Sequence, residues 1–210
     1  MAKEVLTTPV GEATWVWATK PDERFQPVSY KASLILEAKE ATGLQETIDA
    51  AIAEALVVAK AKAPKKNFKT TKPYEPVLDE DGEDTGKVVF KFKQRYEVKP
   101  RNGGDSFFPK IVIYDTGNAN RGPAPIDIGD KLIGNGSQIA IGFELVPWEM
   151  SGNCSVSLRL RSIQIIKLVE YGNGSGDFQS YDNGYQGEVK SAEEKTPVDA
   201  GGKEQEVWDF

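Results

Sequence analysis

Histidine is absent from this 210-residue chain, and cysteine occurs once, as Cys154. The missing imidazole removes the commonest general base and zinc ligand, together with every Ser-His-Asp and Cys-His arrangement. A lone cysteine can form neither an internal disulfide nor a zinc cluster, so we expect Cys154 to be a buried structural thiol inside a cell. The composition therefore excludes histidine-dependent hydrolases and cysteine-built zinc sites.

Long apolar runs are missing as well. No stretch of about 18 apolar residues occurs, so we expect no membrane span. The first residues lack the basic-then-apolar pattern of a secretory signal, so we expect no secretion. The chain is long enough to bury one sizeable core, and its 20 glycines and 12 prolines indicate many turns.

The net charge of −6 conceals a basic body. Residues 172–210 hold nine acidic residues and three lysines, and therefore carry the whole net charge of −6. Residues 79–84 add five acids in a single loop, which leaves the remaining body at net +5. Such asymmetry between segments indicates a nucleic-acid partner.

The stretch over residues 87–99 alternates between apolar or aromatic and basic residues, as a strand with two different faces does. One face carries Val88, Phe90, Phe92, Tyr96 and Val98, and the other carries Lys87, Lys91, Lys93, Arg95 and Lys99. A row of cations suits a phosphate backbone, but solvated lysines also protect sheet edges from aggregation. From this run alone, both interpretations stay open.

Five strands are predicted, over about 28–37, 87–99, 107–115, 137–147 and 154–168, with a Gly103-Gly104 turn making the second and third a hairpin. One long helix follows the first strand, with a capping box at Thr42 and Gln45. Its core stripe is expected at Ile48, Ile52, Ala55, Leu56 and Ala59. The pattern favours a mainly β fold, a five-stranded OB-type Greek-key barrel, over a two-sheet sandwich.

The chain divides into three predicted parts. Residues 1–12 are expected to form a flexible arm, and residues 13–171 the folded domain. Residues 172–210, rich in Gly, Ser, Asp and Asn, cannot bury a core and are expected to be disordered.

Three segments resemble the single-stranded-DNA-binding proteins of tailed DNA phages. They are Trp15-Val16-Trp17 with Pro21-Asp22-Glu23-Arg24-Phe25 and residues 30–34, then residues 136–141, then residues 157–166. The acidic terminus closing on Trp208-Asp209-Phe210 is similar to the end of that family's chains. The resemblance covers residues 13–170 and the tail, and it implies an OB fold, sequence-tolerant binding of single strands, no catalysis and no cofactor.

The resemblance also implies a role in phage DNA replication, recombination and repair in the host cytoplasm. Partners would be single-stranded DNA and, through Trp208, Asp209 and Phe210, a polymerase, helicase or primase; a homo-oligomer stays open. Candidate phosphate contacts are Lys91, Lys93, Arg95, Lys99, Arg101, Lys110, Arg159 and Arg161. Candidate stacking platforms are Trp15, Trp17, Tyr96, Phe107, Phe108 and Tyr114.

Two other classes are weighed against this interpretation. A DNA-processing enzyme could hold magnesium on Asp79, Glu80, Asp81 and Asp84, but carboxylates that bind a metal are usually fixed by the fold rather than crowded into an irregular loop. A virion structural or decoration protein could use the β-rich body and the basic strand for assembly. Retention of single-stranded DNA in a gel would separate a single-stranded-DNA-binding protein from a virion protein.

Overall fold

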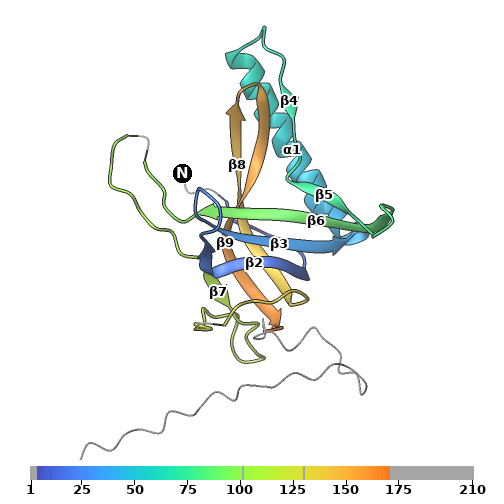
Figure 1. The fold of residues 1–210 in the computed structure, drawn as a ribbon, viewed down its shortest axis with the longest axis vertical. Coiled ribbons are helices and arrows are strands. Elements are labelled where there is room, and N and C mark those ends of the chain that lie inside the picture. Colours follow the sequence, from blue (N-terminus) through green and yellow to red (C-terminus); the bar gives the residue numbers. More distant parts are fainter. Residues whose placement is uncertain (1–3, 101, 130, 171–210) are drawn as a thin grey trace, which may run out of the picture. The chain divides into compact units, whose positions relative to one another are not determined.

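The computed structural model describes residues 4–100, 102–129 and 131–170 (Figure 1). Their elements, in chain order, are β1 Leu6–Thr7, β2 Gly11–Asp22, β3 Ser29–Glu37, α1 Ala38–Lys62, β4 Lys69–Thr70, β5 Tyr74–Leu78, β6 Asp84–Arg95, β7 Val112–Tyr114, β8 Gln138–Met150 and β9 Asn153–Lys167. No helix in these ranges is both long and apolar enough to cross a membrane.

Five of the strands close into a barrel. β2 pairs with β3, β3 with β6, β6 with β9, β9 with β8, and β8 returns to β2. All these pairs are antiparallel except β6–β9, which meet in parallel at Phe92 and Leu158. This ring of five is the Greek-key barrel of the OB type, so the predicted fold class is confirmed.

The membership of the barrel differs from the prediction at residues 107–115. Only β7 is a strand there, and it pairs in parallel with β9 rather than as a hairpin with β6. The predicted hairpin is reduced to one bridge between Val98 and Phe107. The reason is that the apolar side chain of Ile113 is buried beside Ile163 of β9, which a tight hairpin on β6 would not allow.

The place of that strand in the barrel is taken by β2, which was not predicted as a full strand. A register shift after Thr14, with Trp15 at φ 51°, interrupts the alternation that would have identified it. Residues 1–12 were expected to be flexible, but strands occur in the described part of this segment: β1 pairs with β8, and β2 begins at Gly11.

Helix α1 leaves β3 without a break. It begins at Ala38, and the Thr42 hydroxyl donates to the Ala38 carbonyl within the helix, so the predicted capping box does not form. The predicted apolar stripe is confirmed: Ile48, Ile52, Ala55 and Ala59 are buried and Leu56 is partly buried. The stripe packs against β8 and β9, which run past the barrel and turn at Ser151 and Gly152.

Helix α1, β4 and the ends of β8 and β9 around this turn form a projection from the barrel, which we call the arm (Figure 1). The barrel itself is filled by alternating side chains, as predicted for β6, where Phe90 and Phe92 are buried. At Gly142 of β8 a Cβ would lie 2.2 Å from the Ser162 Oγ of β9, so a larger residue there would require the Ser162 side chain to rotate away.

Candidate nucleic-acid interface

The outer face of β2, β3 and β6 carries a row of an aromatic residue and cations. Trp17 is the register partner of Lys31, and Lys31 is the register partner of Lys93. Arg95 stands two residues beyond Lys93 and therefore on the same face. Phe92 and Gln94, which alternate with Lys93 and Arg95 along β6, are buried, so Lys93 and Arg95 face the solvent.

A buried carboxylate organises this row. Asp22 is only 2% exposed, and its two oxygens accept from Arg24 Nε at 2.9 Å and from Lys31 Nζ at 2.9 Å. These hydrogen bonds, from Arg24 first and Lys31 second, hold the pKa of the Asp22 carboxyl well below its ordinary value. The ionised carboxylate fixes both cations in place before any ligand arrives.

The fixed cations lie against aromatic rings. The Arg24 guanidinium carbon is 4.5 Å from the centre of the Trp17 ring and 5.9 Å from that of Phe25. Lys31 Nζ is 4.7 Å from the Phe25 ring centre, and Phe25 is 61% exposed. Rings and cations therefore share one surface, as cation–π contacts allow.

We call this surface the barrel patch: Trp17, Arg24, Phe25, Lys31, Lys93 and Arg95. It holds four cations, and Asp22 beneath it is one anion. Partial burial, and then the charges of Lys31 and Arg95, lower the pKa of the Lys93 ammonium. A bound anion would relieve this repulsion, so the patch is suited to a negatively charged ligand.

Two hollows flank the barrel patch. One, of about 470 Å³, is lined by Arg95, Tyr96, Lys99 and Phe108 among others, and the Tyr96 and Phe108 rings lie 5.2 Å apart in it. The other, of about 280 Å³, is lined by residues that include Trp15 and Trp17. Trp15 is 65% exposed there, and its backbone N–H donates to Asn135 Oδ1. Flat, exposed rings beside a cationic row are the two components that sequence-tolerant binding of single strands requires.

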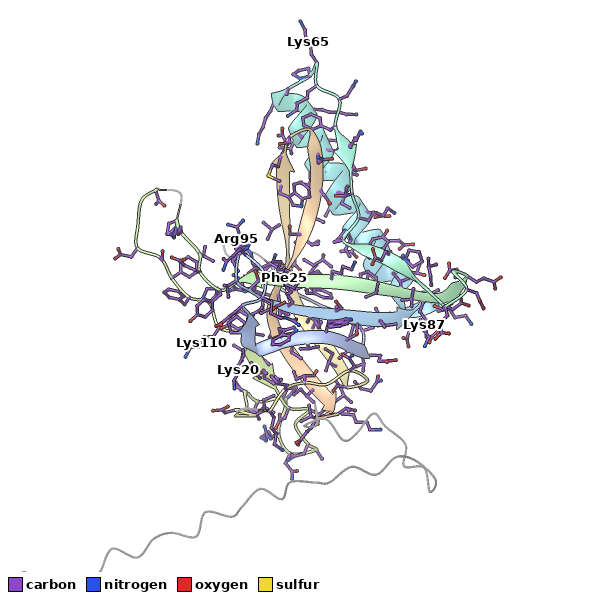
Figure 2. All side chains as sticks on the ribbon, viewed as in Figure 1. Lys20, Phe25, Lys65, Lys87, Arg95 and Lys110 are labelled. Carbon is purple, nitrogen blue, oxygen red and sulfur yellow. The ribbon has the colours of Figure 1, made fainter. Side chains whose placement is uncertain are left out.

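Figure 2 shows Phe25 and Arg95 at one end of the β2–β3–β6 sheet and Lys87 at the other end. Lys87 is bound to Glu37 at that far end, at 3.4 Å. The positive charge of β6 is therefore available at its Arg95 end, whereas at its Lys87 end it is neutralised by Glu37.

The structure brings together one subset of the predicted residues: Trp15, Trp17, Lys93, Arg95, Tyr96, Lys99 and Phe108 lie in the barrel patch or line its hollows. Lys99 also lies 3.6 Å from the Glu97 carboxylate. Phe107 is exposed at its bridge to Val98, beside Phe108 in sequence.

The other predicted phosphate contacts have different surroundings. Lys91 on β6 forms an ion pair with Glu75 of β5. Arg159 and Arg161 both pair with the buried Glu144 of β8, at 3.5 and 3.2 Å. A phosphate would have to compete with these carboxylates.

The remaining predictions concern Lys110, Tyr114 and residues outside the described ranges. Lys110 is exposed and forms no ion pair with any residue in those ranges. Tyr114 is half-buried in β7. Arg101, Trp208, Asp209 and Phe210 lie outside the described residues, so their predicted roles stay predictions.

Three residues of the barrel patch were missed from the sequence: Arg24, Phe25 and Lys31. Lys31 carried a usable signal, because it alternates with the core residues Tyr30 and Ala32 and so had to face outward. Arg24 and Phe25 stand in a turn-rich connection, where no periodicity indicates which way a side chain points.

The acidic loop serves the turn between β5 and β6. Asp79 Oδ1 accepts from the N–H groups of Asp81 and Glu83, and Asp84 Oδ1 accepts from that of Gly86. Across residues 4–100, 102–129 and 131–170, no group of three His, Cys, Asp or Glu side chains could hold a metal ion. Two of the four carboxylates weighed as magnesium ligands, Asp79 and Asp84, therefore accept backbone hydrogen bonds that hold this turn.

Comparison with known proteins gives whole-length matches, although no family model matches the chain. The single-stranded DNA-binding protein of Escherichia phage T7 is 26% identical over 230 aligned positions, covering 100% of this chain and 94% of the relative. This similarity confirms the resemblance inferred from the sequence motifs.

Solved structures agree on the fold. The crystal structure of gp2.5, a single-stranded DNA-binding protein encoded by bacteriophage T7, matches 89% of this chain and 100% of its own, with a TM-score of 0.61 and 24% identity. The single-stranded DNA-binding protein from bacteriophage Enc34 in complex with ssDNA matches 80% of this chain and 89% of its own, with a TM-score of 0.52 and 12% identity. At these identities the likeness establishes a shared fold.

Proposed function

We propose that this chain, as a relative of phage single-stranded DNA-binding proteins, binds single-stranded DNA without sequence preference on its barrel patch. The observation that carries the proposal is the row of Trp17, Lys31 and Lys93 across three strands, with Phe25 and Arg95 beside it. The relatives from phages T7 and Enc34 are single-stranded DNA-binding proteins, which supports the same ligand for this chain.

The phosphates lie on the cations. Lys31, Lys93 and Arg95 repel one another, and each phosphate that approaches them removes part of that repulsion and releases counterions from the strand. Since these groups contact only the backbone, their attraction does not depend on which base is attached.

The bases stack on the exposed rings. Phe25 offers an exposed ring beside Lys31, and the tilted pair of Tyr96 and Phe108 lies with Arg95 in the hollow of about 470 Å³. The Arg24 guanidinium, itself stacked on Trp17, presents a further flat cationic surface. Every base has a π-face, so stacking tolerates any sequence.

The biological role follows from this binding mode. The protein covers and protects single strands during phage DNA replication, recombination and repair in the host cytoplasm, and it performs no catalysis. Its acidic terminus recruits a polymerase, helicase or primase, with Trp208 and Phe210 as apolar anchors and Asp209 as the charged contact. The support for the recruitment is the amino-acid sequence of residues 172–210 alone.

Titration with oligo-dT, followed by tryptophan fluorescence, tests the proposal. Stacked bases quench indole, so the expected result is a saturable loss of emission that weakens with salt and recurs with mixed-sequence DNA. A Trp15→Phe, Trp17→Phe variant, which keeps Trp148 and Trp208, should lose most of the quenching while keeping its fold. No binding of oligo-dT at low salt, by quenching or by gel retention, would reject the function.

A further inference from the structure

The end of the arm gathers five lysines where α1 stops and the chain turns back along β9. They are Lys60, Lys62, Lys65, Lys66 and Lys69, which we call the tip, and all five are exposed. Figure 2 shows Lys65 at the end of the arm, away from Arg95 and Lys110. Helix α1 has 25 residues and is therefore about 37 Å long, so the tip is a separate surface from the barrel patch.

The backbone of the tip is held by specific hydrogen bonds. The Ala63 N–H donates to the Ala59 carbonyl and the Lys66 N–H to the Ala63 carbonyl, so the chain makes two successive turns. The Lys69 N–H then donates to the Gly152 carbonyl at 2.9 Å, which ties the segment to the β8–β9 turn. The lysines are thus displayed on an ordered scaffold.

Most of this charge has no carboxylate beside it. Lys66 lies 3.2 Å from Glu149, but Lys60, Lys62, Lys65 and Lys69 form no ion pair with any described residue. Cations in the last turn of a helix offset its dipole, which accounts for Lys60 and Lys62. Lys65 and Lys69 lie beyond the helix, where this explanation does not apply.

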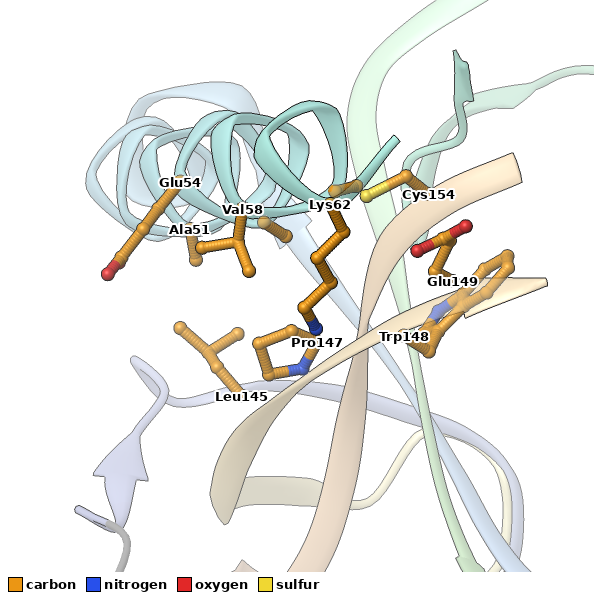
Figure 3. A pocket seen from close by; sticks show the side chains of 11 residues that line it. Ala51, Glu54, Val58, Lys62, Leu145, Pro147, Trp148, Glu149 and Cys154 are labelled. Atoms are coloured by element: carbon orange, nitrogen blue, oxygen red, sulfur yellow. The ribbon is translucent and has the colours of Figure 1, made fainter. Parts of the chain in front are cut away.

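A groove of about 380 Å³ adjoins the tip between α1 and the β8–β9 hairpin (Figure 3). Its lining includes the apolar side chains of Val58 and Pro147, the indole of Trp148, the Lys62 ammonium group and the carboxylates of Glu54 and Glu149. Figure 3 shows the Lys62 side chain extended from the helix across toward Pro147. The groove therefore offers apolar side chains and an indole for a base, while the positive charge comes from Lys62 and the adjoining tip.

We propose that the tip and this groove form a second contact for single-stranded nucleic acid, so that one long strand is held at two places on the same molecule. The inference rests on the proposed function of the barrel patch. A strand bound there brings further phosphates to the tip at high effective concentration, which favours nucleic acid over an acidic protein as the ligand.

The test compares short and long DNA on two charge-matched variants. The tip variant carries Lys60→Gln, Lys62→Gln, Lys65→Gln and Lys69→Gln. The control carries Lys39→Gln, Lys87→Gln, Lys131→Gln and Lys167→Gln, four lysines outside both surfaces. The probes are oligo-dT of about 8 nucleotides, within the site size of one OB fold, and of about 40 nucleotides.

The tip variant should match the control with the short probe and bind the long probe more weakly. Each lost phosphate contact removes about 0.7 from the log–log salt slope, so four contacts remove up to about 2.8. Between about 50 and 200 mM salt, the decline in affinity for the long probe should then be up to about 50-fold smaller than in the control.

Three results would overturn the inference while leaving the proposed function intact. The first is equal binding of the long probe by both variants, and the second is an equal loss with short and long probes. The third is loss of poly-L-glutamate binding by the tip variant with DNA binding unchanged, which would assign the tip to an acidic protein. Failure of the unaltered protein to bind either probe would instead reject the proposed function.

Discussion

Removing three of the four cations of the barrel patch should weaken the binding of single-stranded DNA and reduce the dependence of its affinity on salt concentration. The variant is Lys31→Gln, Lys93→Gln and Arg95→Gln, which keeps a polar, flexible side chain at each position and removes three positive charges from one face. Asp22 retains Arg24 as its ion-pair partner, so the connection between β2 and β3 should stay in place.

The magnitude follows from the geometry. A phosphate about 4 Å from one exposed cation gains about 1 kcal/mol in a water-like medium, so three contacts supply about 3 kcal/mol. At about 1.4 kcal/mol for each factor of ten, the loss at low salt is on the order of 100-fold. The salt slope should fall by about 2.1, because each contact to a single strand contributes about 0.7.

The assay is a titration with oligo-dT at several salt concentrations, with thermal unfolding measured on the same samples. The matched control is Lys39→Gln, Lys87→Gln and Lys131→Gln, which removes the same charge from positions outside the barrel patch. A salt slope equal to that of the control, with the fold intact, would show that the patch is only solvated and would refute the reasoning.

Three further predictions concern rings, protons and the terminus. Phe25→Ala should weaken oligo-dT binding by about 1–3 kcal/mol with little change in thermal stability, as removal of a stacking platform does; a lower melting temperature with unchanged affinity would make Phe25 structural. The pKa of Asp115 is lowered to about 2, first by Arg121 and then by the Ala124 N–H, so its ionised form stabilises the fold above its ordinary value near 3.8. The unaltered protein should therefore have a larger free energy of unfolding than Asp115→Asn above about pH 4, and this difference should vanish as the pH falls through 2. A difference that persists at low pH would contradict this explanation. Deleting Phe210 alone should abolish pull-down of a replication partner and spare DNA binding, and pull-down that survives would remove the anchor.

Local periodicity was sufficient to predict the core face of the barrel. Phe90 and Phe92 alternate with lysines, and Ile48, Ile52 and Ala55 recur at helical spacing, so burial could be inferred without any knowledge of partners. Five strands, short turns and one helix then pointed to the correct fold class.

Pairing between distant segments could not be predicted in the same way. The run around Ile113 was identified as a strand, but its partner is β9, about 50 residues away, and nothing local distinguishes that parallel pair from a hairpin. The barrel patch depends on the same information: Arg24 lies over Trp17 while hydrogen-bonded to Asp22, and Lys31 meets Lys93 through the β3–β6 register. Sequence patterns supplied the types of residue in the site but not their neighbours.

The continuity of β8 and β9 from the barrel into the arm restricts how the arm can change length during evolution. Both strands use a period of two, and their register is continuous from Phe143 and Leu160 to the turn. An insertion of one residue in β9 between Val156 and Leu158 would place these two buried side chains on opposite faces of the strand. Longer or shorter arms among homologues should therefore differ by matched additions on both strands next to the turn at Ser151 and Gly152, with α1 changing by whole turns to keep its apolar stripe against them.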